Sequence, residues 1–101
     1  MKLNVSTVLK ALDGSNLVDR AQKPVTLKEV VIEALLNPLG SDAMGGQEKY
    51  SMMKLAEKVH RSAGEVDVTV EELVLIKNRV GCVCTPLVTG RAFDLLEGRE
   101  Q

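Results

Sequence analysis

The sequence predicts a mostly α-helical protein, a compact bundle of about four helices preceded by an N-terminal segment that fits either a helix or a β-hairpin. Two observations support this prediction. After residue 25, apolar residues recur at the three- and four-residue spacing of helix faces. Two Thr-x-x-Glu capping boxes, together with Gly and Pro residues, mark where those helices begin and end. The length of 101 residues fits one domain, with 25–98 as the helical core and 1–24 as the attached segment.

The segment 1–24 is compatible with two local structures, which the sequence leaves open. One set of apolar residues has the spacing of a helix face, and an overlapping set alternates as in a half-buried strand. Asp13-Gly14 could end the helix or turn a hairpin whose return strand is Ser15–Asp19. The helical set is Val5, Val8, Leu9 and Leu12, and the alternating set is Leu3, Val5, Thr7 and Leu9.

The first well-defined helix follows Thr26. Its hydroxyl can accept the Glu29 backbone N–H in a capping box, and the Glu29 side chain can reach back to the Thr26 N–H. Pro38 disfavours helical geometry at the residue before it, so this helix should end near Leu36. A loop from Gly40 to Gly46 is expected next, because Gly, Ser and Asp there supply turn chemistry.

Three further helices are predicted along the rest of the chain. The second runs from about 47 to 62. The third begins in a second capping box at Thr69–Glu72 and should stop at Gly81. The fourth has Thr85 as its N-cap and Pro86 as its first residue, and Gly98 ends it.

The charge and the hydropathy pattern narrow the class of function. Thirteen basic and fourteen acidic residues give a formal charge of −1 with no long run of either sign, so the surplus of cations typical of a nucleic-acid-binding surface is missing. No apolar stretch reaches the roughly 18 residues of a membrane span. The N-terminus lacks the apolar region of a signal peptide, and two closely spaced cysteines fit a reducing, cytoplasmic location.

No catalytic, cofactor or metal site is expected. Cys82 and Cys84 could begin a zinc site, but such a site usually has four ligands, and the single histidine, His60, lies in a different helix. His60 also lacks the nucleophile and the orienting partner that a general base needs. The two cysteines fit small apolar positions in the turn between the last two helices. We therefore expect a protein that is not an enzyme and has no cofactor.

Four residues are candidates for contacts with a protein partner. Met52 and Met53 cannot both face one core, so Met53 or Tyr50 should present an exposed, adaptable side chain. Gly90 lies inside a predicted helix, where it costs about 1 kcal/mol relative to alanine. A helix packed closely against it, within the fold or across a dimer, would offset that cost. The candidate partner-binding residues are Tyr50, Met53, Gly90 and Phe93.

Three helix-and-cap stretches occur at Lys23–Leu36, Glu65–Gly81 and Pro86–Glu97. In order and spacing they resemble small proteins, encoded by tailed phages and prophages, that have no assigned activity. The resemblance rests on helices and caps, so it carries no functional residues with it. It implies a bacterial cytosol and a phage role: assembly, an accessory function in DNA metabolism, or interference with a host protein.

We expect from these observations a non-enzymatic interaction protein that binds a protein partner or itself. The alternative hypothesis is a nucleic-acid-binding regulator. In that alternative, the helix pair at 70–97 packs as a helix-turn-helix, and its phosphate contacts are Lys77, Arg79 and Arg91.

The apolar residues also predict a homo-oligomer, most simply a two-fold dimer. The helix at 26–36 carries more apolar residues than one face needs, since Val30–Ile32 and Leu35–Leu36 spread around it. Closed two-fold dimers are the commonest assembly of small proteins. The candidate contact elements are the helices at 26–36 and 86–97, and in the monomeric alternative residues 1–24 cover the same surface.

Overall fold

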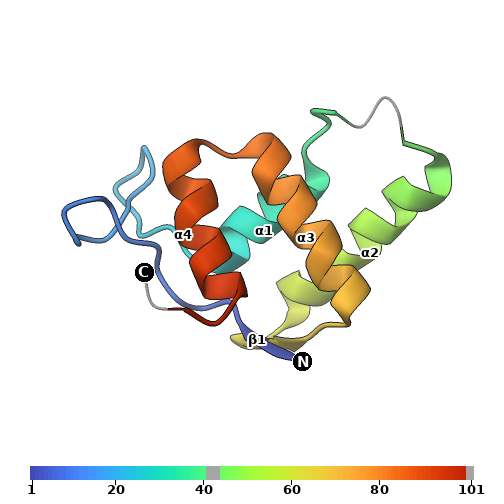
Figure 1. The fold of residues 1–101 in the computed structure, drawn as a ribbon, viewed down its shortest axis with the longest axis horizontal. Coiled ribbons are helices and arrows are strands. Elements are labelled where there is room, and N and C mark those ends of the chain that lie inside the picture. Colours follow the sequence, from blue (N-terminus) through green and yellow to red (C-terminus); the bar gives the residue numbers. More distant parts are fainter. Residues whose placement is uncertain (41–43, 100–101) are drawn as a thin grey trace.

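The computed structural model describes residues 1–40 and 44–99. Within these residues the chain forms four α-helices and one two-stranded antiparallel sheet (Figure 1). The mostly helical prediction is therefore confirmed, while positions 41–43 of the predicted loop lie outside the described residues. The elements are β1 (Lys2–Asn4), α1 (Leu27–Leu36), α2 (Gly46–Arg61), β2 (Glu65–Asp67), α3 (Val70–Val83) and α4 (Pro86–Leu96).

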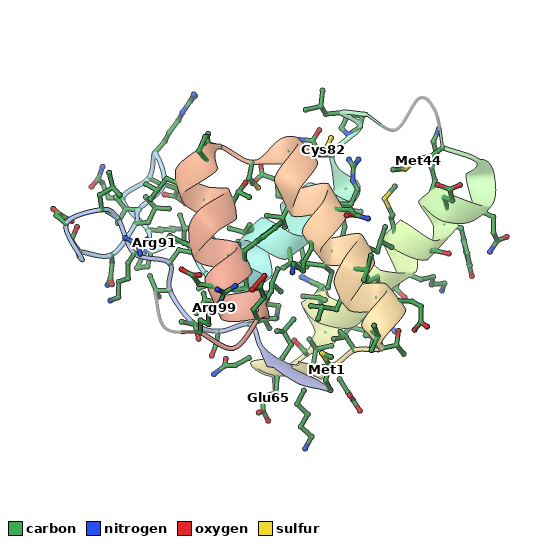
Figure 2. All side chains as sticks on the ribbon, viewed as in Figure 1. Met1, Met44, Glu65, Cys82, Arg91 and Arg99 are labelled. Carbon is green, nitrogen blue, oxygen red and sulfur yellow. The ribbon has the colours of Figure 1, made fainter. Side chains whose placement is uncertain are left out.

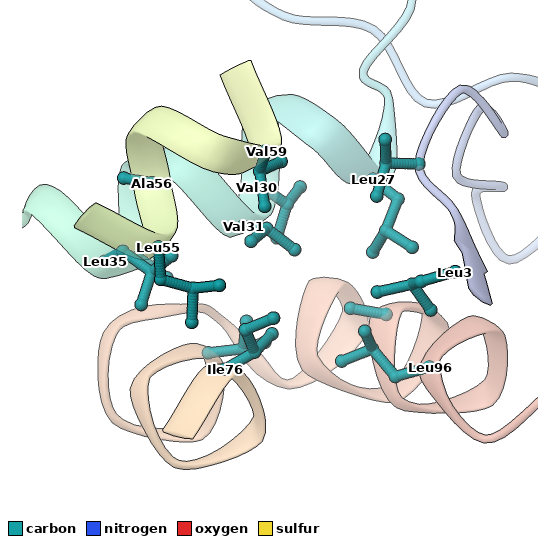
Figure 3. Packing of buried hydrophobic residues seen from close by; sticks show 14 of the residues in the cluster. Leu3, Leu27, Val30, Val31, Leu35, Leu55, Ala56, Val59, Ile76 and Leu96 are labelled. Carbon is teal, nitrogen blue, oxygen red and sulfur yellow. The ribbon is translucent and has the colours of Figure 1, made fainter. Parts of the chain in front are cut away.

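The helices form two layers that enclose an aliphatic core. Figure 3 shows α1 and α2 on one side of the core and α3 and α4 on the other. Helix α1 is central, because it packs against each of the other three helices. One Tyr, one Phe and no Trp leave the core to aliphatic side chains. Its most deeply buried members include Leu27, Val31, Val59, Ile76 and Val80.

Both predicted capping boxes start a helix, and they differ in how fully they form. At α3, the Thr69 hydroxyl accepts the Glu72 backbone N–H at 3.1 Å, and the Glu72 carboxylate accepts the Thr69 N–H at 2.8 Å. At α1, the Thr26 hydroxyl accepts the Glu29 N–H over a longer distance of 3.4 Å. The α3 cap is therefore the stronger start signal of the two.

The Glu72 carboxylate also joins α3 to α2, because it accepts a hydrogen bond from the Lys58 ammonium at 3.1 Å. Partial burial, the largest single influence, raises the pKa of Glu72. Hydrogen bonds from the Thr69 backbone and from Lys58 together outweigh burial, and the pKa lies below its ordinary value of 4.5. The charged form of Glu72 is therefore the one the fold stabilises.

The N-terminal segment adopts extended structure, and the helical alternative for residues 1–24 is wrong. Leu3, Val5 and Leu9 are all buried, as the alternating pattern requires. The segment folds this way because its hydrogen-bonding partners are distant in sequence. Strand β1 pairs with β2, with Leu3 opposite Val66, and the Leu9 N–H donates to the Val25 carbonyl at 2.9 Å.

The turn predicted at Asp13-Gly14 is present in this segment. Residues Lys10 and Asn16 form a single antiparallel bridge around it, and Gly14 has a positive φ of 86°, which glycine adopts without strain. The return segment pairs at Leu17, whose N–H donates to the Leu9 carbonyl at 2.9 Å. The segment therefore turns back on itself as the hairpin alternative predicts, but its two arms are joined by isolated bridges and not by a regular two-stranded ladder.

Helix α3 continues past Gly81 to Val83, so the predicted stop at Gly81 is wrong. A glycine ends a helix when it takes a left-handed conformation, as Gly98 does with a φ of 78°. Gly81 instead stays helical beside α4, where a Cβ atom would lie 3.7 Å from the ring of Phe93. Tertiary packing therefore overrides the local glycine signal, and the helix ends at Val83, with Cys84 as its C-cap, just before Thr85-Pro86 starts α4.

Candidate interaction surface

An apolar groove lies on the surface between α1 and α2. It consists of two adjoining hollows of about 240 and 400 Å³, and Leu36 and Met53 line both of them. We call this surface the α1–α2 groove. Its principal apolar residues are Ile32, Leu36, Met53 and Ala56, and its charged or titratable residues are Lys49, Glu57 and His60.

On each of the two helices, one residue of an adjacent apolar pair is buried in the core and the other is exposed in the groove. On α2, Met52 is 4% exposed and Met53 is 40% exposed, because successive helical residues point about 100° apart. On α1, Leu35 is 2% exposed and Leu36 is 57% exposed. The expectation that one of two adjacent methionines leaves the core is confirmed, and the apolar surplus predicted for 26–36 reaches solvent at Leu36.

Charged residues flank Met53 along the exposed face of α2. Lys49 and Glu57 lie four residues before and after it, so helical spacing places all three on one face. The Glu57 carboxylate is also near two cations of its own helix, Lys54 at 3.8 Å and Arg61 at 3.4 Å. These are exposed pairs, which contribute little to stability.

Tyr50 lies one turn before Met53 and is 53% exposed. Its ring is 5.6 Å from the Lys54 ammonium, a weak cation–π contact at an exposed site. Tyr50 and Met53 therefore lie on adjoining parts of one helix surface.

Gly90 lies on a different surface, which includes Leu12, Pro86 and Leu87. Leu12 is 85% exposed at the tip of the N-terminal turn. Beyond the helix turn that carries Gly90, no described atom lies within 4 Å of the place its Cβ would take. The expected close packing of another helix against Gly90 within the fold is therefore wrong, since α4 turns this residue to solvent.

Phe93 lies at the contact between α3 and α4. It is partly buried against the core, and its ring lies 5.0 Å from the Lys77 ammonium. Lys77 in turn donates to the Glu97 carboxylate at 2.8 Å. The structure therefore uses Phe93 and Lys77 to join α3 to α4, and neither residue belongs to the α1–α2 groove.

Arg79 is a buried structural residue, so its predicted role as a phosphate contact is wrong. It is 2% exposed, and its Nε donates to the Ala34 carbonyl at 3.2 Å. Its Nη2 donates to the carbonyls of Asn37 and Leu39 at 2.7 and 2.8 Å. Pro38 has no N–H to offer Ala34, and the guanidinium supplies the missing donor at the negative end of the α1 dipole.

Arg91 is also occupied within the fold. Figure 2 shows it between α4 and the N-terminal loops. Its guanidinium donates to the carbonyls of Lys10 and Ala11, both at 3.0 Å. Each of the three cations expected to contact phosphate, Lys77, Arg79 and Arg91, therefore has a partner within the chain. This geometry weakens the nucleic-acid alternative.

The two thiols and the histidine do not form a cluster. In residues 1–40 and 44–99, no group of three or more His, Cys, Asp and Glu side chains has a geometry that could hold a metal ion. Cys82 is exposed, and Cys84 is partly buried. Burial, and secondarily the charge of Glu33, raises the pKa of the Cys84 thiol above its usual value. His60 lies in the α1–α2 groove, on α2.

Comparison with known proteins adds no relative to this description: no family model, curated protein or solved structure matches the chain. No helix in the described part of the chain is both long enough and apolar enough to cross a membrane. The geometry by itself therefore defines a small four-helix protein with an apolar groove between its first two helices.

Proposed function

We propose that this protein is a non-enzymatic interaction protein that binds another protein chain through the α1–α2 groove. The observation that carries the proposal is the joint exposure of Leu36 and Met53, on facing helices, beside two adjoining hollows that both residues line. Exposed apolar side chains that line a groove with polar residues at its borders are typical of helix-binding surfaces. Methionine suits such a surface because its side chain adapts to the shape of a partner.

A phage role is the setting we propose for this binding. The resemblance of three helix-and-cap stretches to small proteins of tailed phages and prophages supports a bacterial cytosol and a role in assembly, in DNA metabolism or in interference with a host protein. In this proposal, the protein carries out such a role by binding a partner through the α1–α2 groove.

Site-specific photo-crosslinking tests the proposed function. A photoreactive phenylalanine analogue replaces Met53 or Leu36 in the groove, and Val74 serves as the control because it is an exposed apolar residue on α3. We expect the two groove positions to give a discrete adduct with a protein chain in cells, while position 74 gives none. Equal adduct yields at all three positions, or none at the groove positions, would show that the groove is not a protein contact.

A further inference from the structure

We propose that the chain that occupies the α1–α2 groove is a second copy of this protein, with the two α2 helices antiparallel about a two-fold axis at Met53. This inference rests on the proposed function, and it specifies the partner. It follows from the order of side chains along the exposed face of α2, which is complementary to itself when reversed.

The charged residues carry the complementarity. A two-fold axis at Met53 places residues equally distant before and after it opposite each other across the interface. Lys49 and Glu57 are each four residues from Met53, so Lys49 of one copy faces the partner's Glu57, and the same pair forms again by symmetry. A parallel arrangement would instead place Lys49 opposite the partner's Lys49, which is repulsive.

The residues at the two ends of this face, a glycine and a histidine, also match in size. Gly46 and His60 are seven residues from Met53, and a Cβ at Gly46 would have no described atom within 4 Å. There is therefore room at Gly46 for the imidazole of the partner's His60.

No other described part of the chain takes this place in the groove. The N-terminal loops, which the monomeric alternative uses as a cover, lie beside α4 at the end of the molecule opposite α2 (Figure 1). Arg91 holds them there through the carbonyls of Lys10 and Ala11. The described residues that line the two hollows come from α1, from α2 and from the two residues just after α1.

Both members of the proposed Lys49–Glu57 pair are available for it in chemical terms. Among the described residues, the ion-pair partners of Glu57 are two exposed cations of its own helix, at 3.4 and 3.8 Å, and a carboxylate accepts several hydrogen bonds at once. No ion pair or hydrogen bond of Lys49 is seen with another described side chain, and the residue is exposed. The two Lys–Glu pairs would set the direction and register of the helices, while Met53 and Leu36 supply the apolar contact.

Charge reversal tests this arrangement directly. We expect light scattering coupled to size exclusion, in low-salt buffer at high micromolar concentration, to give wild-type protein twice the chain mass of 11.0 kDa. The Lys49→Glu and Glu57→Lys variants should each elute as a monomer. In each variant, residues 49 and 57 carry the same charge, so both symmetry-related 49–57 contacts across the interface become repulsive. Glu71→Lys, an exposed substitution on α3 with the same change in charge as Glu57→Lys, should stay dimeric.

Mixing the two single variants is the decisive measurement. The Lys49→Glu chain carries carboxylates at both positions, and the Glu57→Lys chain carries ammonium groups at both. In a mixed pair opposite charges therefore meet twice across the interface, so the dimer should return. The double variant, Lys49→Glu with Glu57→Lys, should also dimerise alone. That result would show that neither substitution unfolds the chain.

A wild-type mass that stays near 11.0 kDa overturns the inference, as does a dimer that both single variants retain or that mixing fails to restore. Failure of the proposed function is a separate result. A monomer whose groove positions still crosslink to a different protein refutes the second copy and leaves the proposed function standing.

Discussion

Replacing Arg79 by methionine is the substitution with the largest expected effect on stability. Methionine keeps much of the length of the buried side chain but offers no donor. Its introduction leaves the carbonyls of Ala34, Asn37 and Leu39 without the guanidinium that now donates to them at 2.7–3.2 Å. Water can compensate least at Ala34, because the hydrogen bond there is buried and Pro38 has no N–H.

The magnitude follows from opposing contributions. A buried acceptor without a partner costs about 1–3 kcal/mol, and hydrogen bonds to a charged group contribute about 1.5–3 kcal/mol each. Releasing the guanidinium from its buried site offsets part of that loss, because burying a charge is costly. We expect a net destabilisation of about 2–4 kcal/mol. For a domain of this size each kcal/mol lowers Tm by about 4–8 °C, so the melting temperature should fall by roughly 10–30 °C.

Thermal unfolding followed by circular dichroism measures this effect, with Arg91→Met as the matched control. Arg91 also donates to two carbonyls, but it is only partly buried, so water can replace it and the expected loss is about 1 kcal/mol or less. A decrease in Tm for Arg79→Met no greater than that for Arg91→Met would refute the assigned role of Arg79 at the end of α1.

Two further substitutions and one labelling reaction test other features of the structure independently. Glu72→Gln should be less stable than wild type at neutral pH, and the difference should shrink in urea unfolding as the pH falls below 4.5. The reason is that the folded-state pKa is lowered, so the stabilisation is lost as the carboxylate protonates. Gly90→Ala should raise the unfolding free energy by about 0.5–1 kcal/mol, since its site is open; a loss of stability would indicate a hidden contact. Iodoacetamide at neutral pH should label Cys82 before Cys84, whose pKa is raised by burial, and peptide mass analysis reports the order.

The helix boundaries were predictable where the signal is local. Thr26 and Pro38 bracket α1, and the observed helix Leu27–Leu36 lies between them. Thr85-Pro86 likewise starts α4. A cap or a proline acts on the backbone within one turn, so its effect is readable without tertiary information.

The N-terminal segment could not be decided from its own residues, because β1 pairs with β2 across most of the chain. The same limit applies to Arg79, whose acceptors are carbonyls at the end of another helix. One signal was present: Pro38 leaves the Ala34 carbonyl without a helical donor. That signal indicates that a donor is needed, but not which residue supplies it.

The candidate groove was predictable in part. Two adjacent residues of a helix cannot both face one core, so one of Leu35 and Leu36 must be exposed. The same argument applies to Met52 and Met53, and in each pair the second residue is the exposed one. What the sequence does not show is that Leu36 and Met53 line the same hollows. That depends on how α1 and α2 pack, which is a tertiary property.

The pairing of Lys2 with Asp67 has a consequence for how the chain acquires its structure. During synthesis, β1 is made before α1 and α2, but its partner strand is made only after them. Leu3 then shares a core with Ile76 and Leu96 from the last two helices (Figure 3). The residues of β1 therefore stay unpaired until α1, α2 and β2 have been made. Contacts between distant residues slow folding, so we expect the core to close only after α4 has been made, and truncation before α4 to leave the core-facing side of α1 exposed to water.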